Sequence, residues 1–256
     1  MKIDKPRLRN ALKKLQQVTY DRAESANVAM APQEMLDFLA MLAGLKPVCL
    51  VGRGFDDPKW MAGVEALALG MKLLVMRGAA WDAEPENDGF PDWYSEIAGG
   101  LSVPQEAVYI CKRRPVAREL EAVSAAGEIA MDQEAGLLGY PLCCVREHYQ
   151  GQRKLGEAIT LMLRRISGGD EEEMKRIVRE DDGMSPETEA ERTLLDEATA
   201  RRWAPFTSVN MCVSCAGDPD GPAMRMSHQY EALARAVSPD FALKIATSHG
   251  VLHGGF

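Results

Sequence analysis

The chain lacks any apolar run long enough to cross a membrane. A transmembrane helix needs about 20 consecutive apolar residues, and no hydrophobic stretch among the 256 residues approaches that length. Residues 1–14 are basic and polar, and they lack the apolar core of a secretory signal. We therefore expect a cytoplasmic protein without a membrane partner.

Positive charge is also in short supply. The chain has 30 Lys and Arg against 38 Asp and Glu, a net charge of −8. Proteins that bind phosphate backbones usually carry a basic surplus, at least locally. The basic clusters in this chain are short and are typical of solvated helix faces. The composition therefore argues against nucleic acid as a partner.

Three stretches of different character divide the chain. Residues 1–45 predict two helices, because Leu8, Leu12 and Leu15 recur at helical spacing in the first of them. We expect these N-terminal helices to serve a protein partner or a homodimer. Residues 46–127 form the second stretch, and residues 128–256 form the third, which is helical in pattern and carries the clustered cysteines.

The second stretch alternates short apolar runs with helical segments. The runs "PVCLVG", "KLLVMRG" and "EAVYICKR" are short enough for strands, and each is followed by a helix-like segment. Strand–helix alternation with short connections is typical of parallel strands joined by crossover helices. The sequence thus predicts an α/β fold, in which a small three-stranded parallel α/β unit precedes a mainly helical cysteine-bearing domain.

The six cysteines need an explanation, because disulfides are rare in the cytoplasm. Cys49 and Cys111 lie inside apolar strand-like runs, where a free cysteine usually packs as a small hydrophobe. The other four cluster in two short motifs. Clustered cysteines in a reducing compartment favour metal binding or catalysis.

The first motif is "GLLGYPLCCVREHY", residues 136–149. Pro141 should begin a helix and place Cys143 and Cys144 in its first turn, where the helix dipole lowers a thiol pKa. Adjacent side chains on a helix diverge by about 100°. We therefore expect the two sulfurs to point in different directions, and either one could be the ligand.

The second motif is the C-x-x-C of Cys212 and Cys215 in "NMCVSC". Its spacing lets two sulfurs converge on one ion, and it is shared by zinc, iron–sulfur and thioredoxin-like redox sites. A thioredoxin-type motif should open a helix after a first strand. This one is expected in a loop, which makes the redox interpretation weaker.

Together the two motifs predict a metal centre with Cys143, Cys144, Cys212 and Cys215 as ligands. Zinc requires four nitrogen or sulfur ligands, and His148 or His228 could replace one thiol. An iron–sulfur cluster tolerates three cysteines and one open iron. The expected divergence of the adjacent thiols favours the cluster slightly over zinc. Tyr140 and His148 are candidates to support the ligands or to handle protons.

The stretch "LLGYPLCCV" resembles the mark of an uncharacterised microbial family, an L-G-Y-P-x-C-C motif followed by a C-x-x-C-like element. The resemblance covers about residues 46–245. It implies a small α/β segment before the motif and a shared cysteine site, but no activity. The second element departs from the family pattern, because Asn210 and Met211 stand where a proline is expected before Cys212.

Three functions follow as hypotheses. The leading one is a metal-binding protein with an iron–sulfur cluster, whose open iron would support sulfur transfer or redox chemistry. The alternative is a zinc-stapled or metal-free protein-interaction module, and a further alternative is a dithiol oxidoreductase. The sequence names no substrate or reaction and leaves open whether the protein is an enzyme. All metal hypotheses require the two cysteine motifs to meet in space.

Overall fold

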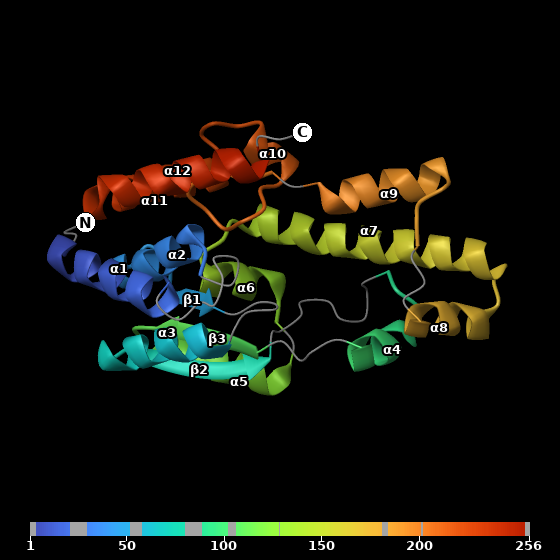
Figure 1. Cartoon of the computed structure of the whole chain (residues 1–256), viewed down its shortest axis with the longest axis horizontal. Coiled ribbons are helices and arrows are strands. Elements are labelled where there is room, and N and C mark those ends of the chain that lie inside the picture. Colours follow the sequence, from blue (N-terminus) through green and yellow to red (C-terminus); the bar gives the residue numbers. More distant parts are fainter. Residues whose placement is uncertain are drawn as a thin grey trace.

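A computed structural model describes residues 4–20, 30–51, 58–79, 89–101, 106–127, 129–180, 184–200 and 202–253. Helices dominate this part of the chain (Figure 1). The helices are α1 (Lys5–Tyr20), α2 (Pro32–Ala43), α3 (Pro58–Gly70), α4 (Tyr94–Leu101), α5 (Arg114–Ala126), α6 (Met131–Leu138), α7 (Leu142–Ser167), α8 (Glu171–Glu180), α9 (Glu189–Thr199), α10 (Val213–Ala216), α11 (Pro222–Val237) and α12 (Pro239–His253). The strands are β1 (Val48–Val51), β2 (Leu74–Ala79) and β3 (Glu106–Cys111).

The three strands form one small antiparallel sheet in the order β1-β3-β2. Cys49 of β1 lies opposite Ile110 of β3, and Val75 of β2 lies opposite the same residue from the other side. The strands were predicted in the right places, but the predicted parallel three-stranded unit is wrong. The protein is mainly helical with a small antiparallel sheet, and it is not an α/β fold.

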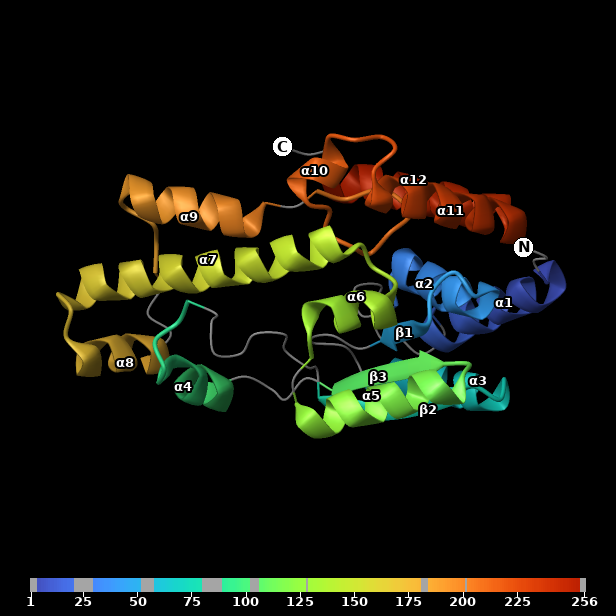
Figure 2. The ribbon, with the colours of Figure 1, turned by 180° about the vertical axis from the view of Figure 1, so that it is seen from behind.

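The connection between β2 and β3 explains the error. Ala79 pairs with Glu106, so the chain leaves the sheet and returns to it at the same end. The helix between them, α4, packs against α8 at a distance from the sheet and does not cross over it (Figures 1 and 2). Only β1 and β2, which are joined through α3, run in the same direction, and β3 lies between them.

Alternating side chains of the strands face two different cores. Cys49 and Ile110 face the larger core, which takes apolar side chains from α1, α2, α3, α11 and α12. Tyr109 and Cys111 face the opposite core, beneath α5 and α6. Cys49 and Cys111 are buried free thiols, so the prediction that they pack as small hydrophobes is confirmed.

The apolar stripe of the N-terminal helices is buried within the chain itself. Leu8, Leu12 and Leu15 belong to the same core as the apolar residues of α11 and α12. This core takes side chains from all three stretches distinguished in the sequence. The division at residues 45 and 127 and the partner role of the N-terminal helices stay predictions.

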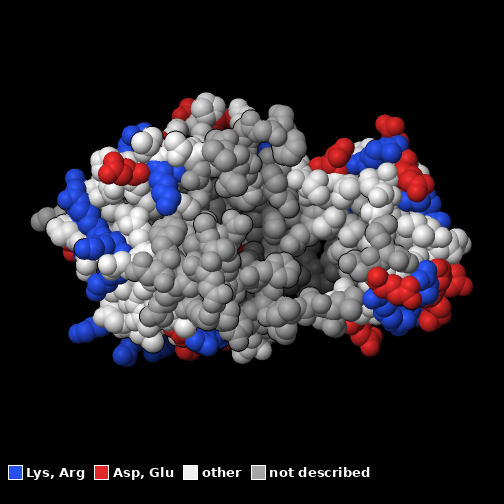
Figure 3. All heavy atoms as spheres, in the orientation of Figure 1, with Lys and Arg blue, Asp and Glu red and all other residues white. Residues whose placement is uncertain are grey.

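The 26-residue helix α7 links this body to a smaller lobe (Figure 2). Leu163 of α7 packs on Met174, Ile177 and Val178 of α8, and α9 runs along the outside of α7. Acidic and basic side chains are mixed on the lobe, whereas Lys and Arg gather at the opposite end of the molecule, where α1 lies (Figure 3). No helix within the described ranges is both long and apolar enough to span a bilayer.

Candidate metal centre

The first pair of cysteines sits at the start of α7. Gly139 ends α6 in the left-handed conformation with φ of 71°, which glycine adopts without strain. This turn brings Pro141 to the N-cap position of α7. Cys143 and Cys144 therefore occupy the first helical turn, as the sequence predicted.

A compact loop carries the second pair to the same place. The Met211 amide donates to the Arg202 carbonyl at 2.7 Å, and the Arg202 amide donates to Asn210 Oδ1 at 2.8 Å. These bonds close the loop just before Cys212. Cys212 then caps the short helix α10, because its sulfur accepts from the Cys215 amide at 3.4 Å.

The two pairs form one cluster. The sulfurs of Cys143, Cys144, Cys212 and Cys215 all lie within 4.8 Å of one another, and the Sγ atoms of Cys143 and Cys215 are 3.6 Å apart. The sulfurs of Cys143 and Cys144 were expected to point in different directions, so that three thiolates would fit better than four, but both adjacent sulfurs belong to the cluster. In the first turn of α7 Cys143 is exposed and Cys144 is buried, and the C-x-x-C segment reaches both sulfurs.

Backbone amides point at the sulfurs. The Cys212 amide donates to Cys144 Sγ at 3.4 Å, in addition to the bond from the Cys215 amide to Cys212 Sγ. The amide of Ala223, in the first turn of α11, donates to Cys215. Amide donors stabilise the thiolate form, which is the form that binds metals.

Glu147 fastens the two segments together. It lies one turn after Cys143 on α7, and its carboxylate accepts from the Val213 amide at 3.1 and 3.2 Å. The same carboxylate pairs with Arg202 at 2.9 Å. Glu147 was not predicted from the sequence, and the local signal for it is its spacing of four residues from Cys143, which places both on one face of α7.

Burial and crowding govern the protonation of the thiols. Burial raises the pKa of Cys144, and burial together with the Cys215 and Cys212 thiols raises the pKa of Cys143 to about 11. The prediction that the helix dipole would lower these two pKa values is therefore wrong. At Cys215, burial opposes ionisation, but hydrogen bonds from the Ala223 amide and the neighbouring thiols outweigh it and lower the pKa.

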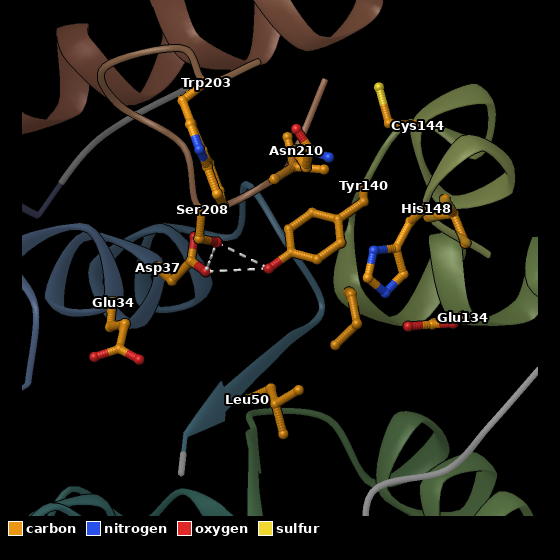
Figure 4. A pocket seen from close by; sticks show the side chains of 13 residues that line it. Glu34, Asp37, Leu50, Glu134, Tyr140, Cys144, His148, Trp203, Ser208 and Asn210 are labelled. Atoms are coloured by element: carbon orange, nitrogen blue, oxygen red, sulfur yellow. Dashed lines mark hydrogen bonds between the residues drawn. The ribbon is translucent and has the colours of Figure 1, made fainter. Parts of the chain in front are cut away.

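Tyr140 does not face the sulfurs. Its hydroxyl lies 2.9 Å from Ser208 Oγ and 3.4 Å from Asp37 Oδ2, and Ser208 donates to the same Asp37 oxygen at 2.7 Å. Figure 4 shows this triad, with the Cys144 sulfur pointing in another direction. Tyr140 thus holds α2 and the 202–211 loop together, beside the cysteine cluster.

A buried ion pair completes this network. Lys46 Nζ lies 3.0 Å from Asp37 Oδ2 and 4.7 Å from the centre of the Tyr140 ring. Burial disfavours the Lys46 ammonium, but the Asp37 carboxylate outweighs it and the pKa of Lys46 is raised. A buried charge requires such a partner. The network therefore fixes α2 against both cysteine-bearing segments.

A cavity of about 340 Å³ adjoins the cluster. Its described walls come from α2, β1, α6, the start of α7 and the 202–211 loop (Figure 4). His148 lines this cavity, and so does Cys144. Within the described ranges, the set of side chains that could hold a metal consists of the four cysteines and includes neither His148 nor His228.

No protein-family model matches the chain, and neither the curated proteins nor the solved structures contain a match. The resemblance to a family with an L-G-Y-P-x-C-C motif therefore stays a prediction. Four cysteines from two distant segments nevertheless form one cluster with the spacing of metal ligands.

Proposed function

We propose that the four cysteines bind one metal ion in a tetrahedral site, with zinc as the ion that the ligand set suits best. The observation that carries the proposal is the convergence of all four sulfurs within 4.8 Å. Tetrahedral zinc with bonds of about 2.3 Å to sulfur places its ligands about 3.8 Å apart. The 3.6 Å between the Cys143 and Cys215 sulfurs matches that edge.

The spacing favours a single ion over the iron–sulfur cluster expected from the sequence. In a cluster the cysteines bind different irons, so the separation between metal atoms spreads the thiolates apart. The sulfurs in this protein lie closer together than that arrangement requires. Iron and sulfide in the purified protein would favour the cluster, whose open iron would support sulfur transfer or redox chemistry.

Four thiolates fill a tetrahedron and leave no position for a substrate. Closed sites of this kind stabilise folds, whereas catalytic zinc sites keep an open position. The ion would join the start of α7 to the loop before α11, where Cys144 and Cys212 lie 68 positions apart in the chain. We therefore infer that the metal is a structural staple in a protein-interaction or ligand-binding protein.

A dithiol oxidoreductase is the competing function. The lowered pKa of Cys215 is what both a redox thiol and a metal ligand require. The convergence of four sulfurs supports a metal, because a dithiol oxidoreductase needs only two cysteines of its own, one to attack the substrate disulfide and one to resolve the mixed disulfide. A bound cation also deprotonates the ligand thiols that burial otherwise keeps neutral.

Metal analysis tests the proposal. Protein purified without oxygen should contain about one zinc per chain and no acid-labile sulfide, and Co(II) exchange should give the absorption spectrum of a tetrahedral thiolate site. Serine at Cys212 or Cys215 should abolish stoichiometric zinc. Alanine at Cys49 or Cys111, buried thiols outside the cluster, serves as the matched control and should leave the zinc content unchanged.

Two results would contradict the proposal. One is wild-type protein that is folded and fully reduced yet binds neither zinc nor Co(II). The other is zinc retained at full stoichiometry by folded Cys212→Ser and Cys215→Ser variants. Circular dichroism of each variant separates loss of the ion from loss of the fold.

A further inference from the structure

The four thiols of the cysteine cluster differ in how they meet solvent. Cys143 is exposed, whereas the other three cysteines of the cluster are buried. Oxidation of a cysteine by a peroxide depends on thiolate character and on exposure, and a bound cation keeps a ligand thiol deprotonated. A small oxidant that approaches the cluster from solvent therefore meets Cys143 before the other three sulfurs.

Cys215 is the thiol best placed to react with an oxidised Cys143. The Sγ atoms of these two residues are 3.6 Å apart, which is contact distance. Cys144 is a poor partner for its neighbour Cys143, because adjacent Cα atoms are only about 3.8 Å apart and most disulfides need at least about 4.4 Å. The geometry therefore favours a bond between the first turn of α7 and the short helix α10.

We propose that hydrogen peroxide oxidises the centre to a Cys143–Cys215 disulfide and so releases the zinc ion, an inference that rests on the proposed function. The Cys143 thiolate attacks one peroxide oxygen, the O–O bond breaks, and the leaving hydroxide takes up a proton. The Cys215 thiolate then attacks the sulfenic acid formed on Cys143. The S–S bond forms, the S–O bond breaks, and the second hydroxide takes up a proton. Two thiolates lose two electrons in total, and the peroxide becomes two waters.

The oxidised protein loses the ion but keeps the same two segments joined. Thiolate is the form of cysteine that binds metals, so the disulfide leaves only Cys144 and Cys212 of the four ligands that a structural zinc site requires. The disulfide links the start of α7 to α10, and the Glu147 carboxylate still accepts from the Val213 amide there. A covalent link thus replaces the metal. Because Cys143 is exposed, a thiol reductant can reach the disulfide and reverse the reaction.

Treatment of the zinc-containing protein with hydrogen peroxide tests the proposal. A chromophoric chelator should detect the loss of the bound zinc, and peptide mass mapping after alkylation should find Cys143 joined to Cys215. Dithiothreitol followed by added zinc should restore the starting state. Two serine variants, each lacking one ligand, form a matched pair: Cys144→Ser should still form this disulfide, whereas Cys143→Ser should lose disulfide formation. Cys49→Ala, which changes a buried thiol outside the cluster, should behave as wild type.

Zinc content measured before oxidation keeps the two proposals separate. Zinc-containing protein that retains its ion in peroxide, or that loses it while Cys212 pairs with Cys215 or with Cys143, would overturn the redox release and leave the metal centre standing. Equal disulfide formation in Cys143→Ser and Cys144→Ser would overturn it as well. Protein purified without zinc that still forms the Cys143–Cys215 disulfide would contradict the metal centre and with it the release of zinc.

Discussion

At the scale of single residues, the cysteine cluster depends on a side chain that is not a cysteine. Glu147 accepts from the Val213 amide and pairs with Arg202, so one carboxylate holds both the start of the 202–211 loop and the residue that follows Cys212. Loss of a group that orients metal ligands typically lowers metal affinity by about 10- to 100-fold. Glu147 is a positioning residue of this kind.

We expect Glu147→Gln to lower zinc affinity about tenfold while leaving the stoichiometry at one ion. The glutamine side chain has the shape of glutamate, but it lacks the negative charge that attracts the backbone N–H of Val213 and the Arg202 guanidinium. Competition with a chromophoric chelator measures the affinity. Glu157→Gln, on the exposed face of the same helix, is the control and should match wild type; equal affinities for both variants would remove this role from Glu147.

A second residue-scale prediction concerns Glu191, which is buried where α9 meets α7. Bonds from Arg165 and from the Thr188 and Glu187 amides lower its pKa from 4.5 to about 2. Its carboxylate therefore contributes stability above pH 4.5, and that contribution disappears as the pH falls toward 2. Urea unfolding should show Glu191→Gln less stable than wild type at pH 7, with the difference shrinking between pH 4.5 and 2. A constant difference across this range would contradict the assignment.

At the scale of elements, the turn between α6 and α7 sets the position of both adjacent cysteines. Gly139 has a positive φ, and a Cβ placed on it would lie 2.9 Å from Cβ of Lys46. Lys46 in turn is fixed by Asp37. The glycine of the L-G-Y-P-x-C-C stretch thus permits the close approach of the α7 start to the strand-bearing segment.

Gly139→Ala should destabilise the protein by about 1–3 kcal/mol, because it adds a left-handed alanine and a contact that must be relieved. Gly136→Ala is the matched control. It lies within α6, where a Cβ meets no atom within 4 Å, so it should be neutral or slightly stabilising. Urea unfolding of both variants measures the difference, and similar stabilities would show that the turn tolerates a side chain.

At the scale of the whole molecule, the proposed ion joins parts of the fold that the chain connects only through the distant lobe of α8 and α9. Between Cys144 and Cys212 the chain runs out along α7 and back along α9 (Figure 1). The ion would link the two ends of this segment, the start of α7 and the loop that holds Cys212 and Cys215. Removal of the ion should therefore destabilise the contact between these two ends. It should leave the lobe around α8 unchanged, because the lobe has its own hydrophobic core.

Hydrogen exchange with and without a chelator tests this expectation. Removing zinc should speed amide exchange in residues 140–148 and 202–217, and leave the exchange of α8 unchanged. If free zinc is present at about a thousand times its dissociation constant, its removal should lower the free energy of unfolding by about 4 kcal/mol. Uniform acceleration across the chain, or none, would contradict a local staple.

Local patterns in the sequence predicted some features of this protein well. Pro141 placed Cys143 and Cys144 in the first turn of a helix, and the apolar strand runs buried Cys49 and Cys111. These results depend on neighbours along the chain. The direction of the strands does not depend on neighbours along the chain. The β2–β3 connection places α4 against α8 and returns to the same end of the sheet, so the alternation of strand and helix wrongly predicted parallel strands.

The sequence by itself determined the chemistry available at the site, because thiols at adjacent and C-x-x-C positions are soft ligands in any fold. Only the tertiary structure decided that all four sulfurs share one cluster, that Glu147 clamps it, and that Tyr140 faces Asp37 and Ser208. Those contacts join residues that lie between 66 and 103 positions apart. The packing of whole helices brings these distant residues together, and no local sequence pattern predicts that packing.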